Sequence, residues 1–184
     1  MTVLRESIVV FLSILVVFIA PAYAQNQTQT QEWVTYDDPI LGISVQYPVS
    51  WEPIEKPGTL SFQVYDNESK PSMFTTIGVS PTLESIDTNK KLMKSFMNEM
   101  RGQISKINEL NNATEVNGEP AAKAVFITKD ETGKDIGRTI DYFMVRQDNS
   151  YFISFITQPT DDKHLPTTEK MVNSFKIQEL AKIE

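Results

Sequence analysis

The spacing of apolar side chains changes twice along this 184-residue chain, and this pattern limits the possible folds more than any other feature. Between residues 33 and 79, apolar and polar residues alternate, as in residues 43–47 (ISVQY), which is typical of half-buried strands. From Leu92 to Ile104, apolar residues recur every three or four positions, which indicates an amphipathic helix. After residue 120 the alternation returns. The chain therefore predicts a sheet whose strands precede and follow one long helix.

Turn residues divide the alternating regions into hairpins. Asn117-Gly118 is a strong two-residue turn signal, and residues 67–71 form a polar turn. We expect strands over residues 33–37, 43–47, 51–54, 60–65, 73–79, 107–116, 121–128, 138–146 and 150–157. We expect helices over residues 88–104, capped by Asp87 or Thr88, and over residues 167–175, capped by Thr167 or Thr168. Sequential hairpins with two helices predict an α+β fold in which helices cover a central antiparallel sheet.

The N-terminus carries an export pattern. Residues 8–20 form an uncharged apolar run behind Arg5, and Pro21 and the small residues Ala22 and Ala24 follow it. This order is typical of a secretory signal peptide, with cleavage expected after Ala24; the alternative is an uncleaved N-terminal anchor. We expect a signal peptide over residues 1–24, a polar spacer over 25–32, one domain over 33–178 and a short tail over 179–184. In either case the domain would lie outside the cytoplasm, secreted or associated with the membrane.

Charge and composition argue against several classes of function. Lys and Arg number 17 against 24 Asp and Glu, and the net charge of −7 argues against a nucleic-acid partner. The chain contains no cysteine, which excludes disulfides, thiol nucleophiles, zinc–thiolate sites and iron–sulfur clusters within it. His164 is the single histidine, so no catalytic triad or His-rich metal site is recognisable. The sequence therefore offers little on which to base an enzyme, and a hydrolase is the weakest of the hypotheses.

The best candidate for a metal site is the group of Asp161, Asp162 and His164, with calcium as the ion considered first. Calcium takes six to eight oxygen ligands, often from turns, but the spacing of these acids does not match an EF-hand loop. The competing interpretation, which we favour, is a solvated acidic loop with a surface histidine.

Three methionines and three sequons also have two interpretations each. Met93, Met97 and Met100 lie on one side of the predicted helix, where thioethers could bind a soft metal, but the same spacing packs a helix on a sheet. We interpret these methionines as core. Sequons of the form N-x-S/T, in segments expected to be spacer, turn or loop, offer attachment points for glycans at Asn26, Asn67 and Asn112.

Several short motifs occur in an order that resembles a known family. They are Asp38-Pro39-Ile40-Leu41-Gly42, Tyr47-Pro48-Val49-Ser50-Trp51, Asn117-Gly118-Glu119-Pro120-Ala121, Tyr151-Phe152-Ile153 and Met171-Val172-Asn173-Ser174-Phe175-Lys176. Together they resemble the PsbP-like family, which comprises relatives of the extrinsic photosystem II subunit P, within a wider group that includes the Mog-type proteins. The resemblance covers residues 33–177. We interpret the motif residues as structural landmarks, namely Tyr47, Pro48, Trp51, Asn117, Gly118 and Phe175.

The resemblance implies an α/β/α sandwich around a central antiparallel sheet, and it implies no catalytic residues. Photosynthetic members lie on the lumenal side of the membrane and help to retain calcium and chloride at the oxygen-evolving cluster, whereas many other members occur in cells without a photosystem. The leading hypothesis is therefore an exported, non-catalytic domain that binds or stabilises a membrane-protein complex. A calcium-binding or other divalent-cation-binding protein is the second hypothesis, and an extracytoplasmic hydrolase is the third.

Overall fold

Ten strands and two α-helices follow one another in the computed structural model, which describes residues 31–67, 70–82 and 86–178. The strands are β1 (Trp33–Asp38), β2 (Ile43–Pro48), β3 (Pro53–Lys56), β4 (Thr59–Asn67), β5 (Lys70–Pro81), β6 (Ile104–Val116), β7 (Glu119–Lys129), β8 (Asp135–Arg146), β9 (Asn149–Thr157) and β10 (Lys176–Ile177). The helices are α1 (Asn89–Glu99) and α2 (Leu165–Ser174), and a 3-10 turn, η1 (Met100–Gly102), follows α1. The predicted signal peptide, Asn26 and the tail lie outside the described residues.

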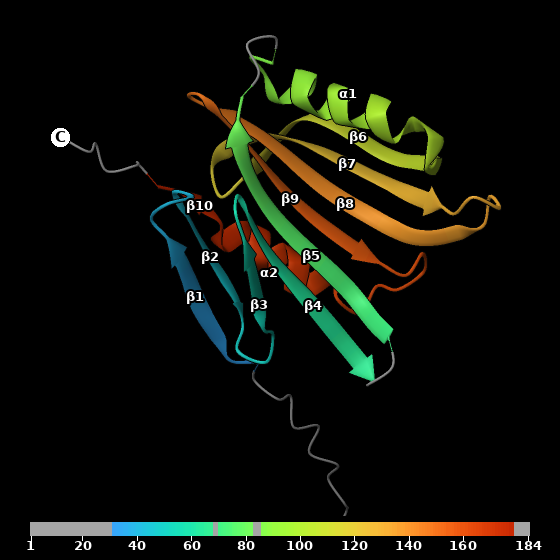
Figure 1. Ribbon diagram of the computed structural model, residues 1–184, viewed down its shortest axis with the longest axis horizontal. Helices are drawn as coiled ribbons and strands as arrows, with labels where there is room; N and C mark the ends of the chain where they lie inside the picture. Colours follow the sequence, from blue (N-terminus) through green and yellow to red (C-terminus); the bar gives the residue numbers. More distant parts are fainter. Residues whose placement is uncertain (1–30, 68–69, 83–85, 179–184) are drawn as a thin grey trace, which may run out of the picture. The chain divides into compact units, whose positions relative to one another are not determined.

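Seven strands form the main sheet in the order β3-β4-β5-β9-β8-β7-β6, and every neighbouring pair is antiparallel (Figure 1). The α+β class with a central antiparallel sheet is thus confirmed. A second, three-stranded sheet, β1-β2-β10, was not expected. It forms because Pro48 ends β2 and its carbonyl accepts a bond from the Trp51 N–H at 2.9 Å. This turn sends the chain into β3 and so starts a new ladder, which leaves the β2 edge to pair with β10.

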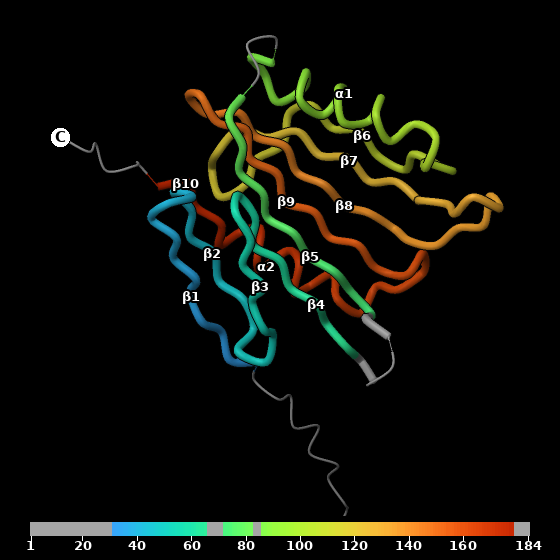
Figure 2. Tube along the Cα trace, viewed as in Figure 1, coloured from blue at the N-terminus to red at the C-terminus, as the bar shows by residue number. Residues whose placement is uncertain are grey.

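One face of the main sheet, the α2 face, is closed by α2 and the small sheet (Figure 2). Leu60 and Phe62 of β4 and Ile77 of β5 point to this side and are fully buried. The ring of Trp33 in β1 lies 4.0 Å from the Lys170 ammonium of α2, a cation–π contact that joins helix and small sheet. Most of the large buried side chains gather here, so this face holds the main core.

The opposite face, the α1 face, is covered only in part. Helix α1 packs over β7 and β8, where Phe96 contacts Phe126 and Phe143 at centroid distances of 6.4 and 5.2 Å. Met93 is buried in this cluster and Met97 packs against it. Met93 and Met97 therefore pack the helix on the sheet, as the sequence predicted, whereas Met100 is half-buried in η1 and is not part of this cluster.

The first helix is shorter than the predicted 88–104. Its start agrees, since the Thr88 side chain accepts a hydrogen bond from the Lys91 N–H at 3.2 Å. It ends at Glu99, and Ile104, expected inside it, begins β6 instead. The Gln103 carbonyl accepts a bond from the Lys129 N–H at 2.8 Å, so the ladder with β7 takes over directly after η1. Ile104 joins the α1 cluster from a strand, which periodicity alone could not separate from a helical position.

The second helix starts two residues earlier than predicted and without either predicted cap. His164 occupies the N-cap position, and Pro166 lies in the first turn, where its fixed φ and missing N–H are tolerated. Thr168 is buried, and its hydroxyl donates to the Leu165 carbonyl at 2.8 Å. Pro166 was therefore a better indicator of where α2 begins than Thr167 or Thr168.

Three further expectations about local structure differ from the structure at least in part. The strand predicted at 51–54 corresponds to β3, which begins at Pro53, and Trp51 lies in the turn before it. The turn predicted at 67–71 lies where β4 and β5 meet, but Asn67 and Lys70 pair as strand residues, and residues 68–69 are outside the described ranges. Asn112 is exposed on β6, beside an irregularity in the pairing with β7, and not in a loop.

Candidate functional site

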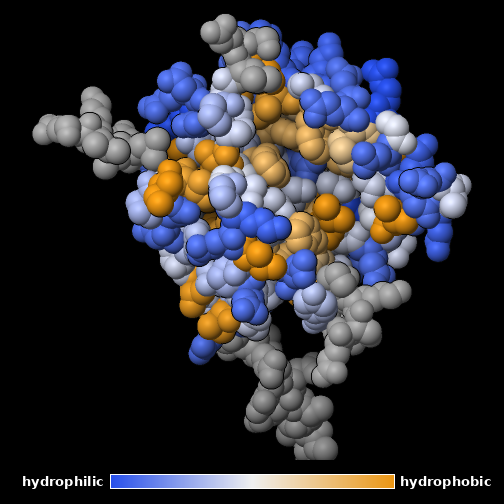
Figure 3. Space-filling model, viewed as in Figure 1, coloured by the Kyte–Doolittle hydropathy of each residue, from blue (hydrophilic) through white to orange (hydrophobic). Residues whose placement is uncertain are grey.

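The half of the α1 face that α1 leaves uncovered is the main candidate for a binding surface, and we call it the open face. Along residues 60–64 of β4 and 73–77 of β5, those that point to the α2 face are buried, whereas those that point the other way are half-buried. The open face consists of alternate residues of three adjacent strands: Ser61 and Gln63, Phe74 and Thr76, and Ser154 and Ile156. Figure 3 views this side of the molecule and shows a hollow of mixed apolar and polar residues beside α1.

A row of polar side chains crosses the open face and continues beneath α1. Ser61 lies opposite Thr76, Thr76 opposite Ser154, and Ser154 opposite Asp141 on β8. The Ser61 and Thr76 hydroxyls are 3.3 Å apart and hydrogen-bonded. Because neighbouring strands lie roughly 4.8 Å apart, the row spans about 14 Å across four strands. It brings a carboxyl group and three hydroxyls into one line that no sequence motif indicated.

Asp141, at the inner end of the row, is the most perturbed acid of the described chain. Its side chain is 1% exposed, and neither carboxylate oxygen has a hydrogen-bond partner of standard geometry among the described residues. Burial raises the pKa of Asp141 to about 7, and the Ser154 hydroxyl opposite lowers it only in part. At pH below 7 this group is therefore mostly a neutral acid. The signal in the sequence was an aspartate at an inward position of the alternating 138–146 strand, and it was missed.

A cavity of about 240 Å³ lies between α1 and the sheet, next to the open face. Phe96, Phe143 and Phe152 form much of its wall, and Ser95 and Glu99 of α1 add polar groups. The Phe152 ring lies against Gly78 of β5, so close that a Cβ at position 78 would come within 1.8 Å of it. A glycine at 78 is therefore required for the shape of this wall.

The aromatic landmarks of the sequence lie on the α2 face, away from this cavity. Tyr47 and Trp51 both contact Phe62, at centroid distances of 4.8 and 6.0 Å, and Pro48 lies between them in the chain. Phe175 is fully buried in the same core. These residues pack and do not line an open pocket.

Asn117 and Gly118 make the two-residue turn between β6 and β7, with φ of 49° and 83°. Positive φ at both positions is what a type I′ hairpin turn requires, and Asn-Gly is its preferred pair. Their geometry is that of a turn, with no part in the open face.

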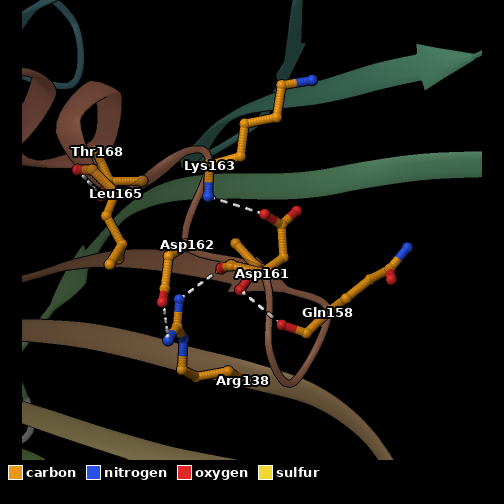
Figure 4. Close-up of polar contacts among 8 residues, drawn as sticks. Arg138, Gln158, Asp161, Asp162, Lys163, Leu165 and Thr168 are labelled. Carbon is orange, nitrogen blue, oxygen red and sulfur yellow. Dashed lines mark hydrogen bonds and ion pairs between the residues drawn. The ribbon is translucent and has the colours of Figure 1, made fainter.

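Asp161, Asp162 and His164 are not arranged as ligands of one ion. The Arg138 guanidinium donates to the Asp162 carboxylate and to the Asp161 carbonyl, each at 2.6 Å, and so ties the loop to β8 (Figure 4). The Asp161 side chain accepts from the Lys163 N–H at 2.8 Å. The expectation of a surface histidine was wrong: His164 is buried, with Nε2 3.2 Å from the Ser72 hydroxyl. Over the described ranges, no group of three or more His, Asp or Glu is placed to hold a metal ion.

Asn67 ends β4 and Asn112 is exposed, which leaves the latter accessible to a glycan.

Among the described residues, no helix has the length and apolar character needed to cross a membrane.

The sequence model of the PsbP-like protein family matches residues 8–177 of this chain. Comparison with curated protein sequences finds no match.

Three solved structures illustrate the shared fold. Cyanobacterial PsbP (CyanoP) from Synechocystis sp. PCC 6803 is similar with a TM-score of 0.56 and 14% identity, over 86% of this chain and 99% of that one. A variant of the protein Mog1 has a TM-score of 0.54 and 10% identity, over 80% and 97% of the two chains. A Bacteroides thetaiotaomicron VPI-5482 protein has a TM-score of 0.55 and 14% identity over 79% of this chain, which spans about half (48%) of that protein's length. At these identities the likeness shows the fold alone.

Proposed function

For this chain, which belongs to the PsbP-like protein family, we propose the role of an exported, non-catalytic domain that binds or stabilises a membrane-associated protein complex on the extracytoplasmic face. The export pattern at residues 1–24 supports the compartment, and the polar spacer at 25–32 would let the domain reach a complex near the membrane.

The observation that carries this proposal is the open face. Ile156 of β9 is 39% exposed, and Phe74, which lies opposite it on β5, is half-buried. Apolar side chains on a concave surface are suited to a partner that fills the hollow and removes them from water. The single histidine lies against Ser72, whereas Asp141 faces the Ser154 hydroxyl, so the described residues bring no histidine to this acid.

Replacement of one open-face residue by a charged residue tests this role. Ile156→Lys places an ammonium in the hollow, and Val49→Lys is the matched control, because Val49 is a 54% exposed aliphatic residue in the turn after β2. A tagged chain of residues 25–184, which contains the spacer, the domain and the tail, would be incubated with detergent-solubilised membranes of the producing organism, and retained proteins would be quantified by mass spectrometry. Unfolding curves would first establish that both variants remain folded.

We expect the wild-type domain and Val49→Lys to retain the same membrane protein, and Ile156→Lys to lose it at least tenfold. Equal retention by both variants would place binding elsewhere on the surface. Retention of no membrane protein by the wild type would contradict the proposed role itself.

A further inference from the structure

Asp141 occupies a position that a carboxylate can hold only with difficulty. On the same face, Phe143 of β8 and Phe126 of β7 lie on either side of the Asp141–Ala124 pair. Phe96 of α1 contacts both rings, so it covers the pair from above. The carboxyl group is thus enclosed between the sheet and the helix, with both oxygens lacking partners of standard geometry.

No charged side chain faces Asp141 from the elements packed against it. The neighbouring inward positions are Ala122 and Phe126 on β7, Phe152 and Ser154 on β9, Thr139 and Phe143 on β8, and Leu92, Met93, Phe96 and Met97 on α1. Most charged residues of the same elements point elsewhere: Lys123, Arg138 and Arg146 lie on the α2 face, and Lys90, Lys91 and Lys94 lie on the exposed parts of α1. Glu99 is also exposed and lines the cavity beside Phe96 and Phe143. An ionised Asp141 would therefore have neither water nor a counter-charge.

We propose that Asp141 is a proton-dependent latch for α1: the helix packs fully on the sheet while this carboxyl group is protonated and loosens when the group ionises. The raised pKa of Asp141 agrees with this arrangement, since burial is its main cause. The inference concerns the helix and its sheet contacts, and it does not depend on the proposed binding role.

The attachments of α1 favour local loosening over complete release. At its start, the Asn89 side chain donates to the Pro120 carbonyl at 2.7 Å and accepts from the Val145 N–H at 2.6 Å. At its end, η1 leads directly into the β6–β7 ladder. Both ends are therefore tied to the sheet. The middle of the helix, where Phe96 covers Asp141, is held mainly by apolar contacts that water can replace once a charge is present.

Hydrogen exchange of backbone amides measures this loosening directly. Exchange would be followed from pH 5 to pH 8.5 on the chain from residue 25 to residue 184, which keeps the spacer, domain and tail, and corrected for the intrinsic dependence of amide exchange on pH. With an ordinary aspartate pKa in the loosened state, the opening constant of α1 amides is expected to rise roughly 100-fold across this range. Amides of β5 and β9 should change much less, because these strands stay in the α2-face core.

Asp141→Asn removes the titration and should leave α1 opening independent of pH. The control is Asp148→Asn, an exposed acid in the β8–β9 turn, which should keep the wild-type profile. If Asp141→Asn does not fold, the wild-type profile still decides. Exchange in α1 that does not change with pH would overturn the latch, and so would equal changes in α1, β5 and β9, which would indicate global destabilisation.

Discussion

On the α2 face of the main sheet, β4 presents Leu60, Phe62 and Val64 to a closed core; on the other face the same strand presents Ser61 and Gln63 to solvent or to the hollow beside α1. The α2 face is covered by a helix and a second sheet, whereas the α1 face has a single helix over part of its width. The first face holds the fold together, and the second leaves room for a partner and tolerates a buried acid. An antiparallel sheet can leave part of one face open when its other face packs on a core.

The largest difference in stability that we expect is between alanine variants of two phenylalanines on adjacent strands. Phe62→Ala opens a cavity on the α2 face and should lower the free energy of unfolding by about 3–5 kcal/mol. Phe74→Ala removes a half-buried ring from the open face and should lower it by about 1 kcal/mol. Urea-induced unfolding measures both values. Similar losses for the two variants would show that the two faces contribute equally.

The next prediction concerns the wall of the cavity. Gly78→Ala places a methyl group against the Phe152 ring, which must rotate away, so the free energy of unfolding should fall by about 1–3 kcal/mol. In the double variant Gly78→Ala with Phe152→Ala the clash is gone, and a double-mutant cycle should give a coupling energy above about 0.5 kcal/mol. Simple additivity would mean that the ring does not lie over the glycine.

Asp141→Asn should stabilise the protein at pH 8 and not at pH 4. Below pH 3.8, the Asp141 carboxyl group is mostly protonated in both the folded and the unfolded chain, so it does not make the free energy of unfolding depend on pH. Between pH 3.8 and about 7 the unfolded chain ionises first and binds fewer protons, so wild-type stability falls with rising pH and then levels off.

The difference between the pKa of Asp141 in the folded and unfolded chains would lower the wild-type free energy of unfolding by roughly 4 kcal/mol above pH 7, at 1.36 kcal/mol per pKa unit. A buried amide without partners offsets part of it, so we expect a net gain of about 1–2 kcal/mol at pH 8. Thermal unfolding of Asp141→Asn and of Asp148→Asn at several pH values checks this. A wild-type stability that rises from pH 4 to pH 7 would contradict it.

The smallest effect is expected in a turn that belongs to neither face. Gln147, between β8 and β9, has a φ of 54°, which a side chain adopts at a cost and glycine adopts freely. Gln147→Gly should therefore raise the free energy of unfolding by about 0.5 kcal/mol at every pH. Chemical denaturation at pH 5 and pH 8 provides the measurement, and a pH-dependent gain would point to an effect on the adjoining strands.

Periodicity and turn chemistry predicted most of the elements. The alternation at 43–47 and 138–146, the helical spacing of Met93 and Met97, and the Asn117-Gly118 turn all correspond to observed elements, because each depends on neighbours in the chain. The motifs around Tyr47 and Trp51 led to the correct family and fold class. Element boundaries were less predictable: Ile104 has the spacing of a helix and the hydrogen bonds of a strand, and only its pairing with β7 decides.

The sequence by itself determined the order of strands and helices, the faces that each strand buries and the absence of cysteine chemistry, since these follow from local spacing and residue type. Only the tertiary structure decided that β2 and β10 leave the main sheet, that Arg138 engages Asp162 and the Asp161 carbonyl, and that Phe96 covers Asp141. These features join residues that are 23 to more than 100 positions apart. Their energies depend on burial and distance in space, which the linear order of residues does not contain.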